Sequence, residues 1–196
     1  MVNPLDHPLF ARVSHYINLI NFLVLVPTGF LIHFPYTGAP INLVRNLHFI
    51  FMYSFLINGF VRFYWSLFSK HKDLVSGFLW NKHDLKTFWP QIKYYLFIGK
   101  QPNNPNKYNP LQKTAYLSFP VLALLQAATG FILYKPEKFG GVVSALGGMS
   151  AVRGMHYLIM IIFLAIISVH VYLVFTEATE MFWLMFFGKT EHKKGI

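Results

Sequence analysis

Four long apolar runs constrain this sequence more than any other feature. They lie at about 13–32, 47–68, 111–134 and 151–175 of the 196 residues. Each run is long enough for a helix to cross a bilayer, since one crossing uses about 20 mostly apolar residues. The crossings and their connections occupy nearly the whole chain. We therefore expect one all-α membrane domain over residues 1–196, a bundle of four transmembrane helices with no separate soluble catalytic domain.

Composition supports a membrane protein and excludes several chemistries. Only 12% of the residues are charged, about half the share that is usual in soluble domains. The chain has no Cys, which excludes disulfides, thiolate zinc sites, iron–sulfur ligation and covalent haem attachment through a C-x-x-C-H motif. The net charge is +10. In a membrane protein an excess of Lys and Arg marks the loops on one side of the membrane, so we do not expect nucleic-acid binding.

Lys and Arg are unevenly divided between the two sides of the predicted membrane. Thirteen of the 17 lie on the side that holds both termini and the loop 69–110. By the positive-inside rule, the termini and this loop are cytoplasmic. Within the loop, the stretch 74–98 mixes Trp, Tyr, Phe and Leu with spaced Lys. This mixture predicts an interfacial amphipathic segment between the second and third helices, in contact with membrane lipid.

Histidines within the apolar runs fall at two depths. Ionisable residues inside a membrane indicate a functional site. Because successive spans alternate in direction, His48 and His156 are expected near the outer edge and His15 and His170 near the inner edge. Two pairs at two depths suit two haems that are each held by two imidazoles.

The fourth span contributes to both pairs. Fourteen residues separate His156 from His170, about 21 Å along a helix, and the two fall on nearly the same face. His33 is an alternative outer ligand, because it lies five turns from His15 on the same helix face. We favour His48 over His33 because Arg45 precedes it.

Three of the four Arg residues stand three positions before a His: Arg12, Arg45 and Arg153. This spacing places the guanidinium on the ligand face, one turn nearer to water. A guanidinium there can bind a haem propionate in a bidentate manner. The alternative is that these Arg residues only anchor helix ends at the membrane surface.

The four spans resemble the b-type cytochrome subunit of membrane-bound nickel–iron hydrogenases and, more distantly, the cytochrome b subunit of formate dehydrogenase. The resemblance rests on RVSHYINLINFLVLVPTGFLIH, RNLHFIFMYSFLINGFVRFYW, YNPLQKTAYLSFPVLALLQAATGFILY and RGMHYLIMIIFLAIISVHVYLVF. It implies a membrane anchor with two haem b groups, one on His48 and His156 and one on His15 and His170. It also implies an iron–sulfur subunit and a catalytic subunit as partners, and a place in the prokaryotic cytoplasmic (inner) membrane.

The same resemblance implies that menaquinone or ubiquinone reacts near the inner haem. The matching loop, at the start of the third span, holds Tyr108, Asn109 and Gln112. A structural role is equally open, because Asn, Pro and Gln in this order are what capping of a helix start requires. The sequence thus predicts an electron-transfer subunit that connects an extrinsic oxidoreductase of the hydrogenase type with the quinone pool. The alternatives are a stand-alone electron carrier of the cytochrome b561 type and a haem-free transporter with a His proton relay.

Overall fold

A computed structural model describes residues 8–69, 79–106 and 108–188. These residues form helices and connections, without strands among them, as an all-α membrane bundle requires. The four longest helices are α1 (Leu9–His33), α2 (Ile41–Phe68), α5 (Pro110–Tyr134) and α7 (Met149–Glu177). Shorter elements connect or follow them: α4 (Lys82–Tyr95), η2 (Pro136–Lys138), α6 (Gly140–Ala145) and α8 (Thr179–Phe187).

The four long helices are long and apolar enough to cross a membrane, which confirms the predicted four spans. They extend beyond the predicted runs, most clearly at α2, which begins at Ile41 instead of near residue 47. Pro40 directly precedes this helix, and proline favours helix starts because the first N–H groups of a helix have no intrahelical partner. The extra turn carries Arg45 and its neighbours beyond the apolar core. Hydropathy alone therefore missed it.

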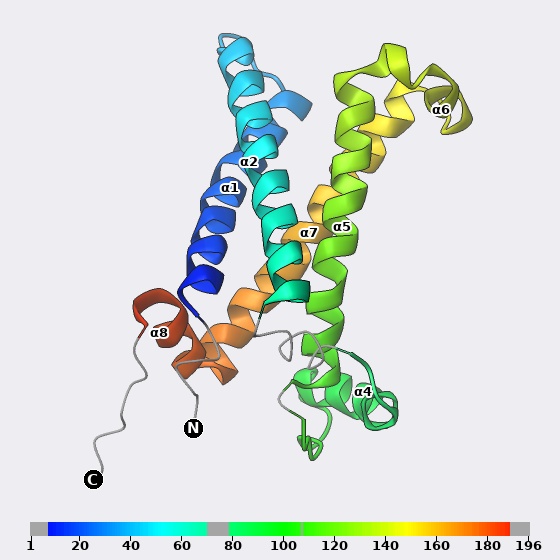
Figure 1. Ribbon diagram of the computed structural model, residues 1–196. Coiled ribbons are helices and arrows are strands. Elements are labelled where there is room, and N and C mark those ends of the chain that lie inside the picture. Colours follow the sequence, from blue (N-terminus) through cyan, green and yellow to red (C-terminus); the bar gives the residue numbers. More distant parts are fainter. Residues whose placement is uncertain (1–7, 70–78, 107, 189–196) are drawn as a thin grey trace.

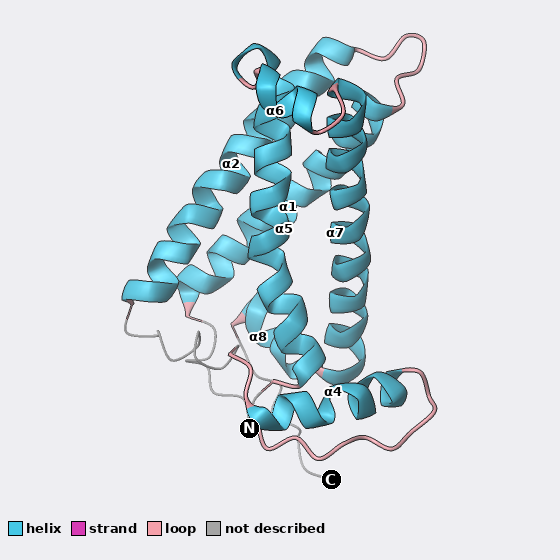
Figure 2. Cartoon of the chain, turned by 90° about the vertical axis from the view of Figure 1, so that its right-hand side faces the viewer, coloured by secondary structure: helices cyan, strands magenta, loops and turns pink. Residues whose placement is uncertain are grey.

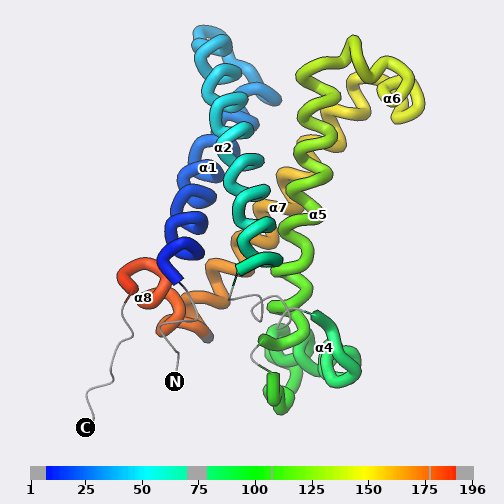
Figure 3. Tube along the Cα trace, viewed as in Figure 1, coloured from blue at the N-terminus to red at the C-terminus, as the bar shows by residue number. Residues whose placement is uncertain are grey.

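The long helices form two antiparallel hairpins. In one hairpin α1 packs on α2, and in the other α5 packs on α7. Figure 1 shows α1 and α2 side by side, with α7 running obliquely behind α5 and the lower part of α2, and Figure 2 shows the same bundle from the side. In the tube view of Figure 3, α8 and α4 lie at the end where α1 and α5 begin, and α6 lies at the opposite end. The elements around the predicted cytoplasmic loop thus share one end of the molecule.

One Phe from each spanning helix joins the two hairpins near the middle of the bundle. The ring of Phe22 lies 5.4 Å from that of Phe55 and 5.1 Å from that of Phe163, and Phe119 lies 5.7 Å from Phe163, all between centroids. Aromatic pairs at such separations are favourable beyond the area that they bury. We call Phe22, Phe55, Phe119 and Phe163 the phenylalanine layer.

Polar groups hold α1 against α2 between this layer and the α8 end. The side-chain amide of Asn58 donates to the backbone carbonyl of Ser14 at 2.9 Å and to Oδ1 of Asn18 at 2.6 Å. Such hydrogen bonds between helices stabilise membrane bundles, because hydrocarbon offers the amide no other partner. The contact fixes which faces of α1 and α2 meet.

The helix α4 lies in the predicted interfacial segment, of which residues 74–78 are outside the described part of the chain. A capping box between Asn81 and Asp84 starts this helix, which lies across the end of the bundle (Figure 2). Leu85 and Trp89 are about two-thirds exposed. Exposed Lys residues accompany them, a composition that suits a membrane surface.

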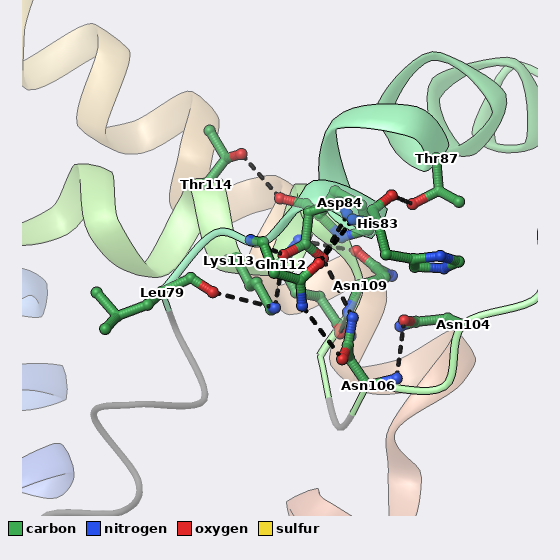
Figure 4. Close-up of polar contacts among 12 residues, drawn as sticks. Leu79, His83, Asp84, Thr87, Asn104, Asn106, Asn109, Gln112, Lys113 and Thr114 are labelled. Carbon is green, nitrogen blue, oxygen red and sulfur yellow. Dashed lines mark hydrogen bonds and ion pairs between the residues drawn. The ribbon is translucent and has the colours of Figure 1, made fainter.

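Asp84 and Lys113 form a buried ion pair where α4 meets the first turn of α5 (Figure 4). Their charged atoms are 2.8 Å apart, and the side chains are 0% and 3% exposed. The Lys113 ammonium also donates to the carbonyl of Leu79, and the backbone N–H of Asn81 donates to Asp84. Burial raises the pKa of the Asp84 carboxyl, but the hydrogen bonds and charge of Lys113 and the Asn81 N–H outweigh it, so that the pKa lies below 3.8.

Replacement of Asp84 by Asn should release α4 from α5. The substitution leaves the buried Lys113 ammonium without a counter-charge, which costs about 3–5 kcal/mol. We expect faster trypsin cleavage at Lys82, Lys86 and Lys93 of the purified protein at pH 7. Since the pKa of Asp84 is depressed, the wild-type pair should persist at neutral pH and weaken only as the pH falls below 3.8.

The double variant Asp84→Leu with Lys113→Met is the matched control. It removes both charges together and should restore slow cleavage. Equal cleavage rates for Asp84→Asn and the wild type would show that the ion pair does not hold α4.

Candidate functional site

Two histidines from different hairpins lie in the half of the bundle nearest α6. His48 is the eighth residue of α2, and His156 is the eighth residue of α7. Both helices begin at the α6 end of the bundle, so the two histidines lie at one level (Figure 1). The sequence assigns this pair to the outer level.

A threonine fixes the imidazole of His48. Oγ1 of Thr28 lies 2.9 Å from Nδ1 of His48, and 2.7 Å and 3.1 Å from the carbonyl oxygens of Val24 and Leu25. A hydroxyl has a single hydrogen, and a carbonyl can only accept. When the Thr28 hydrogen goes to the carbonyl of Val24, its nearest acceptor, Oγ1 is left to accept from Nδ1 of His48. The proton of a neutral His48 then sits on Nδ1, and Nε2 carries the lone pair.

The second hairpin repeats this arrangement at His156. Oγ1 of Thr129 lies 2.8 Å from Nδ1 of His156 and 2.8 Å from the carbonyl oxygen of Leu125, to which it donates. The side-chain amide of Gln126 lies 3.1 Å from Nε2 of the same imidazole. An amide N–H can only donate, so Nε2 accepts. With this orientation of the amide, which leaves Oε1 of Gln126 buried without a hydrogen-bond partner, both contacts agree with a lone pair on Nε2.

Glycines give both rings room against the neighbouring helix. A Cβ atom on Gly130 would lie 3.3 Å from Cε1 of His156. One on Gly29 would lie 3.6 Å from Cε1 of His48 and 3.3 Å from Sδ of Met160. A side chain at position 130 would push against the His156 imidazole, and one at position 29 would press on Met160 beside His48. The two glycines therefore leave space beside the histidines. Such space suits a site for a flat prosthetic group at this level.

His15 and His170, assigned to the inner level, lie toward the α8 end. Phe22 of α1 and Phe163 of α7 are in ring contact, and each histidine is seven residues from one of them. Seven residues are about two turns, so His15 and His170 lie on the helix faces that carry these rings. His170 lies 6.2 Å from the rings of Tyr116 and Phe119, and His15 lies 6.2 Å from Phe186. Aromatic side chains thus surround this level.

The remaining candidates have other surroundings. The ring of His33 stacks on Tyr157 at 4.1 Å, on the exposed side of α1. Arg12 donates from Nε to the carbonyl of Met185 at 3.0 Å, near the end of α8. The structure thus gives Arg12 a backbone partner at the position where a propionate was expected. Arg45 and Arg153 are exposed, one turn before His48 and His156.

The loop that was assigned to quinone forms the cap of α5. Oδ1 of Asn109 accepts from the N–H of Gln112 at 2.8 Å, and Oε1 of Gln112 accepts from the N–H of Asn109 at 3.0 Å. Tyr108 is placed differently. Its ring lies 5.5 Å from Tyr116, which in turn is the neighbour of His170. The capping role of Asn109 and Gln112 is therefore visible, and Tyr108 connects the loop with the inner level.

Sequence reasoning missed the residues that hold the outer histidines: Thr28, Thr129 and Gln126. A signal for the first two exists in the triplet Thr-Gly-Phe, which occurs at 28–30 and again at 129–131. Each copy faces an Arg-x-x-His motif of the next long helix. Pairing the two motifs would have found both threonines.

The outer histidines come from separate hairpins, and each has Nδ1 within hydrogen-bond distance of a threonine hydroxyl of the neighbouring helix. No group of three or more His, Cys, Asp or Glu residues that could hold a metal occurs within 8–69, 79–106 and 108–188. Paired imidazoles suit a metal whose other ligands come with it, as in a porphyrin. Binding at Nε2 of His156 requires the Gln126 amide to move, because both use the same lone pair.

Four helices long and apolar enough to cross a membrane, two of which carry a histidine at their eighth position, suit a membrane-bound cytochrome of the b type. The model of the prokaryotic cytochrome b561 family matches residues 6–188. The chain belongs to this family, and membership implies haem b.

Several relatives carry the provisional name of a Ni/Fe-hydrogenase B-type cytochrome subunit. The one from Azotobacter vinelandii is 28% identical over 186 residues, which cover 85% of this chain and 78% of the relative. The one from Escherichia coli strain K12 is 25% identical over 145 residues, 67% of this chain and 62% of the relative. These relatives confirm the resemblance on which the sequence analysis drew.

A relative from Azospira oryzae carries a different provisional name, that of a protein-methionine-sulfoxide reductase subunit. It is 26% identical over 183 residues, which cover 86% of this chain and 89% of the relative. The same type of membrane protein thus occurs under the names of two kinds of enzyme.

A side chain at Gly130 should disturb the outer site, whereas one at Gly59 should not. Valine at position 130 would overpack against His156, at a cost of about 1–3 kcal/mol relative to valine at position 59, because Gly59 has no described atom within 4 Å of its added Cβ. We expect a lower thermal midpoint for Gly130→Val than for Gly59→Val, measured by intrinsic fluorescence in detergent. Equal midpoints would show that the space beside His156 is not constrained.

Proposed function

We propose that this chain is the di-haem membrane subunit of an oxidoreductase complex and passes electrons between an extrinsic enzyme and the membrane quinone pool. The observation that carries this proposal is the pair His48 and His156, whose imidazoles come from separate hairpins and keep their Nε2 lone pairs. Haem iron between two imidazoles supplies one-electron redox chemistry when it is bound. The whole chain 1–196 would serve as one membrane domain for this purpose.

Within this proposal, the residues divide into two levels. His48 and His156 bind the outer haem, and the exposed Arg45 and Arg153 offer guanidinium groups to its propionates. His15 and His170 bind the inner haem. His33 is a weaker choice than His48, because its ring already stacks on Tyr157, beside the site.

A quinone would react beside the inner level. Tyr108 supports this location, because its ring touches Tyr116, which lies next to His170. The side-chain oxygens of Asn109 and Gln112 accept within the α5 cap, and the Asn109 amide donates to Tyr95, so Tyr108 is the residue of this loop best suited to contact the quinone. Either menaquinone or ubiquinone fits this chemistry.

The extrinsic partner would contain an iron–sulfur subunit and a catalytic subunit, because the chain has no Cys to hold such a cluster itself. Names among the relatives favour a hydrogenase. A second candidate is a reductase that receives electrons from quinol, which the relative from Azospira oryzae favours through its 89% coverage. Purification in a mild detergent followed by mass spectrometry distinguishes the two. A chain that purifies alone would favour the stand-alone carrier.

Replacement of single histidines tests the haem assignment. We expect the wild-type protein to contain two haem b groups per chain by the pyridine haemochrome assay. His48→Ala and His156→Ala should each remove the outer haem, and His15→Ala and His170→Ala the inner one, because an imidazole ligand is lost.

The matched control is His33→Ala, which should keep both haems. If His156→Ala retained two haems per chain, the outer assignment would be wrong. If His33→Ala and not His48→Ala lost one, His33 would replace His48 as the ligand. A wild-type protein without haem, expressed with ample haem supply, would restore the haem-free transporter as an alternative.

Sidedness follows from the same proposal. In the prokaryotic cytoplasmic membrane, the end with α4 and α8 would face the cytoplasm, because most Lys and Arg lie there. The chain has no Cys, so labelling of a single introduced Cys shows on which side of the membrane that position lies. An impermeant maleimide should label Lys138→Cys in cells with intact cytoplasmic membranes, and Lys86→Cys only after these membranes are opened. The reverse pattern would invert the topology.

A further inference from the structure

The chain carries the same side-chain arrangement twice, once in each hairpin. Thr28 of α1 faces His48 of α2, and Thr129 of α5 faces His156 of α7, with Oγ1 to Nδ1 distances of 2.9 Å and 2.8 Å. In both copies a glycine follows the threonine and lies beside Cε1 of the same imidazole. Because the contact between threonine and histidine occurs in both hairpins, it does not depend on the packing of one hairpin alone.

Both threonines are buried, at 7% and 9% exposed. Each hydroxyl donates its one hydrogen to a carbonyl of its own helix, at 2.7 Å for Thr28 and 2.8 Å for Thr129. What remains on each oxygen is the ability to accept. In each copy, this threonine oxygen of the facing helix lies within hydrogen-bond distance of Nδ1 of the imidazole.

We propose that Thr28 and Thr129 are positioning residues that hold His48 and His156 as the Nδ1–H tautomer and thereby keep Nε2 of each ring for haem iron. This inference rests on the proposed function, because it concerns the outer pair of ligands. Neither threonine touches the iron itself. Each acts through the orientation and electron density of its histidine.

Two effects follow from this arrangement. The hydrogen bond prevents the ring from turning so that Nδ1 replaces Nε2, and this favours retention of the haem. An acceptor on Nδ1–H also makes the imidazole a more basic ligand, which favours the oxidised iron and lowers the midpoint potential. Removal of the acceptor should weaken retention and raise the potential.

The experiment replaces each threonine by valine, which has nearly the same shape but no hydroxyl. In the purified full chain, Thr28→Val and Thr129→Val should each release the outer haem about ten- to hundredfold faster to an excess of apomyoglobin. Optical redox titration should show a higher midpoint potential for the outer haem, with the inner haem unchanged. Serine variants at both positions should restore retention and potential, because the hydroxyl is kept.

Thr176→Val is a matched control, because Thr176 makes the same bond to its own helix, to Tyr172 at 2.9 Å, on an exposed face. It should leave both haems as in the wild type. Valine variants that keep the wild-type release rate and potential would overturn the positioning role while the haem assignment stands. A wild-type chain without haem would instead overturn the proposed function, and this inference with it. The two failures are thus distinguishable.

Discussion

Hydrogen bonding within single helices is the constraint on which this molecule depends, because hydrocarbon offers backbone groups no other partner. The same constraint reaches the side chains. A threonine inside a span gives its hydrogen to a carbonyl of its own helix, as Thr28 and Thr129 do, and its oxygen is left to accept. The orientation of His48 and His156 thus follows from the way in which α1 and α5 satisfy their own polar groups.

The two hairpins place a histidine beside a threonine with the same pair of sequence motifs. Each places Thr-Gly-Phe on its first helix and Arg-x-x-His near the start of its second. The two second helices, α2 and α7, both begin at the α6 end, and each carries its histidine at the eighth position. Matching positions in matching hairpins therefore bring the imidazoles to one level. His15 and His170 have no such repeat behind them, and their level depends on the direct crossing of α1 and α7.

Much of this architecture could be predicted from the sequence. Apolar length predicted the four helices, and alternation of direction predicted that His48 and His156 lie at the same end of the bundle. The surroundings of Arg12 and His33 could not be predicted, because their partners, the end of α8 and Tyr157, lie more than a hundred residues away. Asp84 and Lys113 are only 29 positions apart, but they lie on separate helices, and no pattern in the sequence shows that α4 meets the start of α5. Helix periodicity describes one helix at a time and does not state which faces will meet.

The phenylalanine layer has a consequence for charge movement through the bundle. On α7, Phe163 stands seven residues from His156 and seven from His170, so the layer separates the two histidine levels. A phenyl ring neither donates nor accepts a conventional hydrogen bond, and it gives a file of water molecules nothing to hold. These four rings therefore offer no hydrogen-bonding group to a proton wire, whereas electron tunnelling between the two levels would require none. In the proposed di-haem subunit, the layer would act as a dielectric barrier that preserves a voltage while current passes.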